Sequence, residues 1–247
     1  MKSRIVVGGS RGSGRVVAIR LADAGYHVKV VSRTPGQELG THAGSIEHNA
    51  ADLHKPADVH RTADLLKREW SAADGLVFCQ RSRGDNVDWD AEMQVSVEAT
   101  RILVEAFAAA RGDQGGSIVI VTSVASRQIA PEQPIQYNVA KAALAQMMRY
   151  YAAQLGPRGI RVNAVAPASV LKPETSRFYL DDPEKMEMYE RAIPLRRIPT
   201  SEDVAALIEF LLSPSSQMIT GQEIVIDGGL SLATHESLAR AMWSSRT

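Results

Sequence analysis

Three polar residues in the second half of the chain have types and a spacing suited to proton transfer. Tyr137 and Lys141 are four residues apart in the stretch Tyr-Asn-Val-Ala-Lys, and Ser123 precedes Tyr137 by fourteen residues. Residues four apart on a helix share one face, so the Lys141 ammonium can act on the Tyr137 phenol. An unperturbed tyrosine has a pKa of about 10, and a nearby ammonium favours the phenolate and lowers that pKa. The pair therefore predicts a general acid and base, with the Ser123 hydroxyl able to polarise a carbonyl oxygen.

The elements that would position these residues follow from the alternation of segments along the chain. Short runs rich in Val and Ile alternate with longer amphipathic stretches, which is typical of βα units and a parallel sheet. Expected strands cover residues 4–7, 27–31, 75–78, 117–121, 161–165 and 223–226, with a weaker one at 46–49. Expected helices cover residues 14–24, 56–70, 87–111, 134–155 and 201–212. This order predicts an α/β fold: one Rossmann-type domain over residues 1–247, with about seven parallel strands in a doubly wound sheet and helices on both faces.

Composition limits the partners. The 28 basic and 28 acidic side chains cancel, so no net charge favours nucleic acid or an anionic membrane, and a small molecule is the expected partner. No apolar run approaches the roughly 18 residues that span a bilayer, and the first residues lack a signal-peptide core. The single Cys79 excludes an intramolecular disulfide and a multi-Cys zinc site. We therefore expect a cytoplasmic protein without a metal. Surface or loop positions are expected for four histidines whose six-residue spacing matches no metal motif, His42, His48, His54 and His60.

A glycine-rich loop follows the first expected strand. The stretch Gly-Gly-Ser-Arg-Gly-Ser-Gly at residues 8–14 leads directly into the first expected helix. Such glycines permit a tight turn, and backbone amides at the start of the helix can then approach a pyrophosphate. The spacing Gly-x-x-x-Gly-x-Gly differs from the standard Gly-x-Gly-x-x-Gly, so a plain turn is the alternative interpretation. In this context the loop predicts a dinucleotide site.

The end of the second expected strand bears on which dinucleotide binds. In such folds an acidic residue there holds the ribose of NAD, whereas this chain has Ser32 and Arg33. A guanidinium pairs well with phosphate oxygens, so Arg33, helped by Ser32 and Arg11, suits the 2′-phosphate of NADP. NADP(H) is therefore favoured over NAD(H). The alternative is that Arg33 is a solvated residue after a strand.

Two segments lie outside the expected sheet. Residues 168–199 fit no strand, contain four prolines and follow a strand end, where ligands bind in such folds, so we interpret them as a substrate lid. Residues 230–247 form a C-terminal tail with a helical middle at 236–243. The alanine-rich helix at 134–155 permits close helix contact, either with a second subunit or with the chain's own sheet.

Taken together, these motifs resemble the short-chain dehydrogenase/reductase family along nearly the whole chain, from Gly8 to Gly229. The matching positions are the cofactor loop at Gly8, Gly12 and Gly14, the adenine-contacting pair Asp52-Leu53, the catalytic residues Ser123, Tyr137 and Lys141, the stretch Val-Asn-Ala-Val-Ala-Pro at 162–167, and Gly221 with Asp-Gly-Gly at 227–229. The resemblance implies hydride transfer between NAD(P)H and a carbonyl or alcohol. Tyr137 would be acid and base, Lys141 would also hold the nicotinamide ribose, and Ser123 would orient the oxygen. A homo-oligomer, either a dimer or a tetramer, is implied as well.

The chain departs from the family pattern near the expected site. Phe-Cys-Gln-Arg at 78–81 replaces the family's Asn-Asn-Ala-Gly, so Arg81 must turn away or occupy part of the site. Ser96 stands where the family has the Asn of its proton relay, and its hydroxyl can still hold a water. The expected catalytic residues are Ser123, Tyr137, Lys141 and Ser96. The expected cofactor-binding residues are Gly8, Ser10, Arg11, Gly12, Ser13, Gly14, Ser32, Arg33, Asp52, Leu53, Tyr137, Lys141, Pro167 and Val170.

Several loop positions carry cations. Arg81, Arg83, Arg127 and Lys172 are expected at the carboxyl ends of strands, where they either face an anionic substrate or are exposed loop charges. The function favoured is NADP(H)-dependent reduction of a carbonyl, as in a carbonyl or 3-oxoacyl reductase, or oxidation of the alcohol. One alternative is a cofactor-binding or regulatory protein with this fold and weak or no turnover. The other is a non-redox reaction that uses the same Tyr137.

Overall fold

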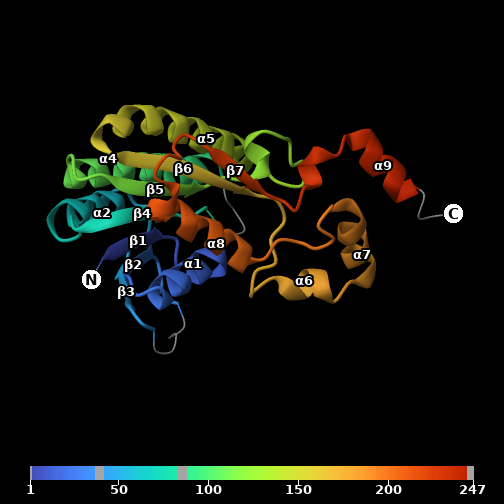
Figure 1. Cartoon of the computed structure of the whole chain (residues 1–247), viewed down its shortest axis with the longest axis horizontal. Helices are drawn as coiled ribbons and strands as arrows, with labels where there is room; N and C mark the ends of the chain where they lie inside the picture. The colour runs from blue at the N-terminus through green and yellow to red at the C-terminus, as the bar shows by residue number, and fades with distance from the viewer. Residues whose placement is uncertain (1, 37–41, 83–87, 244–247) are drawn as a thin grey trace.

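The computed structural model describes residues 2–36, 42–82 and 88–243, and it contains one seven-stranded parallel sheet (Figure 1). The strands are β1 Ser3–Val7, β2 His27–Ser32, β3 Ser45–Ala50, β4 Ala73–Phe78, β5 Gly116–Val121, β6 Ile160–Pro167 and β7 Glu223–Ile226. Their order across the sheet is β3-β2-β1-β4-β5-β6-β7, and every neighbouring pair is parallel. The prediction of a doubly wound α/β sheet is confirmed. The strand with the weak sequence signal, β3, is an edge strand whose residues are half-buried or exposed.

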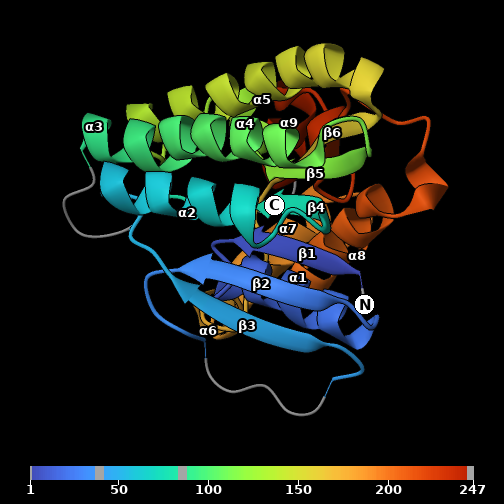
Figure 2. The ribbon, with the colours of Figure 1, turned by 90° about the vertical axis from the view of Figure 1, so that its left-hand side faces the viewer.

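Helices cover both faces of the sheet. They are α1 Gly12–Asp23, α2 Pro56–Arg68, α3 Trp89–Glu92, α4 Ala99–Arg111, α5 Ile135–Leu155, α6 Ser176–Leu180, α7 Pro183–Ala192, α8 Ser201–Leu212 and α9 His235–Trp243. Figure 2 shows α2, α4 and α5 on one face of the sheet and α1 with α8 on the other. Each face has its own apolar core, because alternate strand residues point to opposite faces. The sheet is therefore buried between two helical layers.

The helix expected at residues 87–111 is interrupted inside. Its described part begins at Trp89, where the Asp88 carboxylate accepts a hydrogen bond from the backbone N–H of Ala91 (2.8 Å). The α-helical turn of α3 then changes to a π-helical turn, Met93–Glu98, before α4 continues to Arg111. A π-helical turn widens the backbone spiral and is frequent at functional sites. This one carries Ser96 on its buried side.

The strand order creates a crevice beside β1. The chain proceeds outward from β1 to β2 and β3, and then crosses to the other side of β1 to form β4. At this point the loop after β1 leads to α1 on one face of the sheet and the loop after β4 leads toward α4 on the other, and ligands bind at such places in open α/β sheets. Gly8 lies at the start of the first loop with φ +81°, and a Cβ there would come within 2.6 Å of the Gln80 backbone nitrogen. Only glycine allows the two loops to pass this closely.

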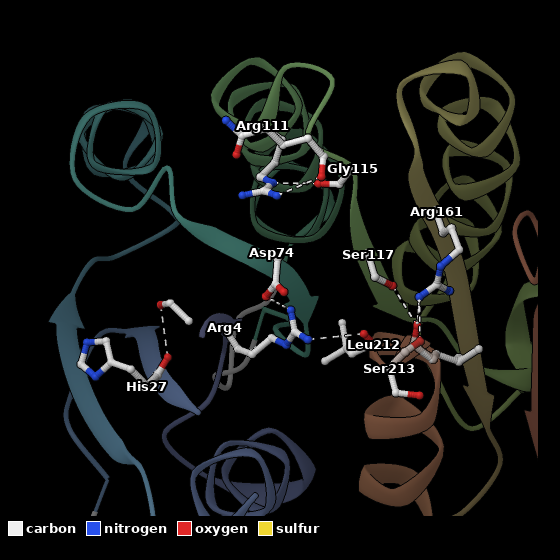
Figure 3. A network of polar contacts seen from close by, with 12 residues as sticks. Arg4, His27, Asp74, Arg111, Gly115, Ser117, Arg161, Leu212 and Ser213 are labelled. Carbon is white, nitrogen blue, oxygen red and sulfur yellow. Dashed lines mark hydrogen bonds and ion pairs between the residues drawn. The ribbon is translucent and has the colours of Figure 1, made fainter. Parts of the chain in front are cut away.

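A polar network lies at the amino ends of the strands, opposite the ends that form the crevice. Figure 3 shows Arg4, at the amino end of β1, in an ion pair with Asp74 at the start of β4, and also donating to the Leu212 carbonyl at the end of α8. Arg161, at the amino end of β6, donates to the Ser213 carbonyl (3.2 Å). Cations thus satisfy carbonyl groups at the C-terminal end of α8. Polar side chains therefore fill the space at the amino ends of the strands, whereas the crevice lies at their carboxyl ends.

The segment after β6 stands apart from the sheet. It holds the short helices α6 and α7, and its backbone pairs at Leu171 with Thr200, just before α8. Figure 1 shows α6, α7 and α9 beyond the main body of the sheet, and α9 packs against α7. No helix in the described residues is long and apolar enough to cross a membrane.

Candidate active site

A cavity at the carboxyl ends of the strands collects most of the residues that the sequence singles out. Its wall comes from the glycine loop, from the ends of β2 to β6 and from α5. The predicted site residues in this wall are Gly8, Ser10, Arg11, Ser13, Gly14, Ser32, Arg33, Asp52, Leu53, Tyr137, Lys141, Pro167 and Val170. Three other predicted residues, Gly12, Ser96 and Ser123, lie outside this wall. One continuous cavity therefore joins the glycine loop to the Tyr137 and Lys141 pair.

Lys141 is almost completely buried, with 4% of its surface exposed. Its Nζ donates a hydrogen bond to the Val121 carbonyl oxygen (2.9 Å) at the end of β5, which fixes the ammonium at the cavity wall. Burial lowers the pKa of Lys141 from 10.5 to about 8. Glu92 opposes this shift, whereas Arg81 and Lys172 lower the pKa further. The lysine therefore titrates close to neutral pH.

Tyr137 lies near two cations. The Nζ atom of Lys141 and the Cζ atom of Arg81 are each 5.6 Å from the centre of the Tyr137 ring. Cations at this range are attracted by the electron-rich face of the ring. Arg81 therefore occupies part of the site beside Tyr137, which is one of the two outcomes considered for this substitution.

Ser123 follows β5 directly and caps a short 3₁₀ turn, Val124–Ser126. Its Oγ accepts a hydrogen bond from the Ala125 backbone N–H (3.2 Å), which leaves the hydroxyl hydrogen available for donation. The 3₁₀ turn packs against α5, the helix that carries Tyr137. The neighbouring Thr122 lies in the cavity wall. Ser123 is thus next in the chain to a wall residue, on a turn packed against the helix of Tyr137.

Ser96 is fully buried and makes a contact that the sequence did not reveal. Its Oγ donates a hydrogen bond to the carboxylate of Glu92, which is itself only 2% exposed. Since a serine hydroxyl has one hydrogen, that hydrogen is committed to Glu92. A buried acid beside the lysine is the main component of the site that sequence reasoning missed. The signal available was Glu92 and Ser96 at i and i+4 on the same helix face.

The glycine loop leads into α1 without a side-chain cap at Arg11. Instead, the backbone N–H of Gly12 donates to Glu174 Oε1 (2.7 Å), from the segment that follows β6. Gly14 packs tightly, because a Cβ there would lie 2.3 Å from the Gly8 carbonyl oxygen. The amino terminus of α1 therefore faces the cavity with a carboxylate already bound to it.

Polar groups line the other end of the cavity, where β2 and β3 end. Ser32 donates to the Thr34 carbonyl oxygen (2.9 Å), and Arg33 and Thr34 are both in the wall. Burial would raise the pKa of Asp52, but hydrogen bonds from His54 and the charge of Arg33 hold it below its usual value. The interpretation of His54 as a surface or loop residue is incomplete, because it lines the cavity and bonds to Asp52 (3.0 Å).

One of the four loop cations expected near a substrate, Arg127, has another position. Arg127 donates to Glu223 Oε2 (2.7 Å) on β7, a carboxylate with no exposed surface, so Arg127 is ion-paired away from the cavity wall. Of the two alternatives for Arg127, a contact with an anionic substrate or an exposed loop charge, this position fits the second. Arg83 falls outside the described residues. Arg81 and Lys172 both line the cavity.

The wall can accommodate a dinucleotide. Backbone and hydroxyl donors of the glycine loop lie at its centre, with Arg33 at one end and Lys141 at the other. Gln80 contributes a buried side-chain oxygen, Oε1, that has no hydrogen-bond partner within the described residues. A ribose hydroxyl or an amide of a bound cofactor would satisfy such an acceptor. No cluster of His, Cys, Asp or Glu suited to a metal occurs in the residues the structure describes.

Known proteins with the same features identify the family. The model of the family described as enoyl-(acyl carrier protein) reductase matches residues 7–231. An uncharacterised oxidoreductase of Mycobacterium tuberculosis is 32% identical over 245 residues, which cover 93% of this chain and 92% of that protein. The chain belongs to the short-chain dehydrogenase/reductase family. It is thus a member of a family of oxidoreductases, and the resemblance seen in its motifs is confirmed.

Solved structures of other short-chain dehydrogenases/reductases agree with this fold. A short-chain type dehydrogenase/reductase from Mycobacterium ulcerans is 26% identical with a TM-score of 0.82, and the match covers 96% of this chain and 97% of that one. A protein of Beutenbergia cavernae, described as an NAD(P)-dependent gluconate 5-dehydrogenase with bound NADP, is 29% identical with a TM-score of 0.81. That match covers 94% of this chain and 97% of the other.

Proposed function

We propose that the protein is an NADP(H)-dependent oxidoreductase that reduces a carbonyl compound or oxidises the corresponding alcohol. The observation that carries this proposal is the single cavity that joins the glycine loop to Tyr137 and Lys141. A cofactor along the glycine loop would bring its nicotinamide ring toward these two side chains. Family membership supports the same class of reaction.

The chain's residues would act on the oxygen of the substrate. When bound, the nicotinamide supplies a hydride to the carbonyl carbon or accepts one from the alcohol. In reduction, Tyr137 gives a proton to the developing alkoxide, and Ser123 donates a hydrogen bond to the same oxygen. The hydride and this proton together convert the carbonyl to an alcohol. Lys141 and Arg81 stabilise the phenolate left on Tyr137 until a proton returns from solvent.

The preference for NADP(H) over NAD(H) rests on the end of β2. Ser32, Arg33 and Arg11 line the same end of the cavity, and a guanidinium there suits the 2′-phosphate. A related protein of Beutenbergia cavernae, described with bound NADP at low occupancy, indicates that this fold can hold NADP.

The charge of the wall favours an anionic substrate. Arg81 and Lys172 line the cavity near Tyr137 and Lys141, and both affect the titration of Lys141. A carboxylate on the substrate would be stabilised by this set of cations. The substrate class we propose is therefore a small carbonyl compound with a negative charge, such as a keto acid.

Three further features of the proposal concern organisation. Residues 168–199, with α6 and α7, would act as a substrate lid within a single domain, and the tail at 230–247 contributes α9, which packs on α7.

The outward face of α5 exposes Ile135, Val139 and Tyr150, which supports assembly of a dimer or tetramer through this helix. The single Cys79 fits a cytoplasmic location.

A screen of NADPH oxidation tests the proposed function. The panel contains ketones, acyl thioesters and cyclic keto acids, and the Tyr137→Phe variant serves as the matched control. We expect at least one compound to be consumed about 10²-fold faster by the unmodified protein than by the variant. No compound above the rate of Tyr137→Phe would contradict the proposal.

A second candidate is a cofactor-binding or regulatory protein with little turnover. Arg81 beside Tyr137 and Glu174 at the amino terminus of α1 favour it, because both occupy space near the expected cofactor. Calorimetry separates the two candidates. NADPH binding without turnover of any panel compound favours the second, and turnover that depends on Tyr137 favours the first. The same panel, analysed by mass spectrometry without added cofactor, reveals a non-redox reaction.

A further inference from the structure

Glu92 is a buried acid whose position the proposed reaction does not yet explain. It ends α3 at the junction with the π-helical turn Met93–Glu98, and only 2% of its surface is exposed. Burying a carboxylate is costly unless donors or a cation compensate for the lost water. Within the described residues, Ser96 is the one hydrogen-bond donor to this carboxylate, and no side chain forms an ion pair with it.

The backbone of the π-helical turn is held at Ser96 by a chain of hydrogen bonds. Thr100 donates from Oγ1 to the Ser96 carbonyl oxygen (2.6 Å), and Gln80 donates from Nε2 to Thr100 Oγ1 (2.9 Å). This chain ties the π-helical turn to the loop after β4. The backbone of Ser96, whose hydroxyl donates to Glu92, is thus anchored by the side chain of Thr100 and, through it, by that of Gln80.

The cation within range is Lys141. The π-helical turn and α3 both pack against α5, which carries the buried Lys141, and Val95 of the π-helical turn lines the same cavity as Lys141. In a medium of low dielectric constant, opposite charges interact beyond the length of an ion pair. The centre of the Tyr137 ring lies 5.6 Å from the Nζ atom of Lys141. The titratable groups that act on the pKa of Lys141 are Glu92 on α3, Cys79 and Arg81 after β4, and Lys172 after β6. The carboxylate in this set is Glu92.

We propose that Glu92 is a positioning residue for Lys141, and that its buried carboxylate, oriented by Ser96, keeps the lysine ammonium charged beside Tyr137. Two cations, Arg81 and Lys172, lie near the same ammonium and oppose its charge. Glu92 opposes the effect that these two cations and burial have on the pKa of Lys141. Ser96, which replaces the family's relay Asn, thus serves to hold this acid. The role of the Lys141 charge in catalysis rests on the proposed function. The electrostatic interaction between Glu92 and Lys141 does not depend on it.

The link can be measured without cofactor or substrate. Unfolding midpoints are recorded from pH 6 to pH 10 for the unmodified protein and for Lys141→Met, and their difference follows the titration of Lys141 in the folded state. We expect this difference to begin to shrink near pH 8. In the Glu92→Gln background, which keeps the shape and the acceptor oxygen, the onset moves about one pH unit lower. The matched control is Glu98→Gln, which removes an exposed acid paired with Arg101 on the same helix.

A kinetic measurement then tests the consequence. With the substrate found in the screen, Glu92→Gln moves the basic limb of the kcat profile toward acid by the same interval, and activity recovers at lower pH. A merely structural role lowers kcat equally at all pH values. If Glu92→Gln does not fold, Glu92→Leu removes the same charge with an apolar side chain.

The outcomes separate the two proposals. An unchanged onset in Glu92→Gln or Glu92→Leu overturns the role of Glu92, whatever the protein turns over. An onset that moves in a protein without NADPH-dependent turnover supports the link and counts against the proposed function. A shift of equal size in Glu98→Gln assigns the effect to general surface charge and also overturns the role of Glu92.

Discussion

Glu174 accepts a hydrogen bond from the backbone N–H of Gly12 at the amino terminus of α1 (2.7 Å). The two residues are 162 positions apart, so the contact joins the glycine loop to the segment after β6. A helix amino terminus attracts anions, and in dinucleotide folds it is the place of the pyrophosphate. The carboxylate of Glu174 and the pyrophosphate would therefore compete for the same donor.

Removal of this carboxylate should strengthen cofactor binding. Glu174→Gln keeps the shape of the side chain but loses its charge, which is worth about 0.3–1 kcal/mol at a helix terminus. We expect the Kd for NADPH, measured by calorimetry, to fall about two- to five-fold. The control Glu184→Gln changes an exposed charge on α7 and should leave the Kd as it is. Weaker binding in Glu174→Gln would show that the carboxylate supports the cofactor.

Lys141 should reduce the stability of the folded protein at neutral pH. Burial lowers its pKa from 10.5 to about 8, which corresponds to a cost of on the order of 3 kcal/mol when both states are protonated. Lys141→Met removes that cost and also the hydrogen bond to Val121, worth about 1 kcal/mol. We expect the variant to be more stable by about 2 kcal/mol at pH 7 and inactive. Denaturant titration measures the first effect, and lower stability of the variant at pH 7 would contradict it.

The same group predicts how stability changes with pH. The folded-state pKa is depressed, so between pH 8 and 10.5 the unfolded chain binds a proton that the folded chain does not. Stability of the unmodified protein relative to Lys141→Met must therefore rise as pH increases through this interval. If the difference in stability between the two proteins stays constant from pH 7 to pH 10.5, the pKa of Lys141 is not lowered in the folded protein.

Arg33 should discriminate between the two nicotinamide cofactors. A charge-assisted hydrogen bond to the 2′-phosphate contributes about 1.5–3 kcal/mol, which corresponds to a roughly ten- to hundred-fold change in Kd. Arg33→Ala should therefore weaken NADPH binding by that factor and change the Kd for NADH by less than about threefold. Arg68→Ala, which removes an exposed arginine at the end of α2, is the matched control. Equal losses for both cofactors would remove the assignment of Arg33 to the 2′-phosphate.

Arg81 should select for charge on the substrate. Arg81→Ala is expected to raise KM about tenfold for a keto acid and less than about twofold for a neutral ketone of similar size. Arg127→Ala should not show this difference, because Arg127 is paired with Glu223 outside the cavity wall. Steady-state kinetics on the two substrates make the comparison. A similar change in KM for both would mean that Arg81 has a steric role only.

Much of the fold was predictable from local patterns. Buried parallel strands such as β1 and β5 give continuous apolar runs, and the glycine loop follows one of them directly. Tyr137 and Lys141 were recognisable because their spacing of four residues matches the helix period. Strand β3 was harder to predict, since an edge strand with exposed positions lacks such a run.

The contacts that distinguish this site depend on distant parts of the chain. Arg81 could be seen as a departure from the family, but its position beside Tyr137 depends on how the loop after β4 meets α5. Arg127 looked equivalent to Arg81 until its partner on β7, Glu223, was known. The burial of Glu92 depends on the π-helical turn, for which the sequence carries no clear signal.

Transfer of deuterium tests the central claim most directly. NADPH carrying deuterium at the transferable position of the nicotinamide is mixed with the best substrate of the screen, and the alcohol is analysed by mass spectrometry. We expect one deuterium on the carbinol carbon with the unmodified protein, and a rate at least about 10²-fold lower with Tyr137→Phe. NADPH binding with no deuterium in any panel compound, or equal rates for the two proteins, would contradict it.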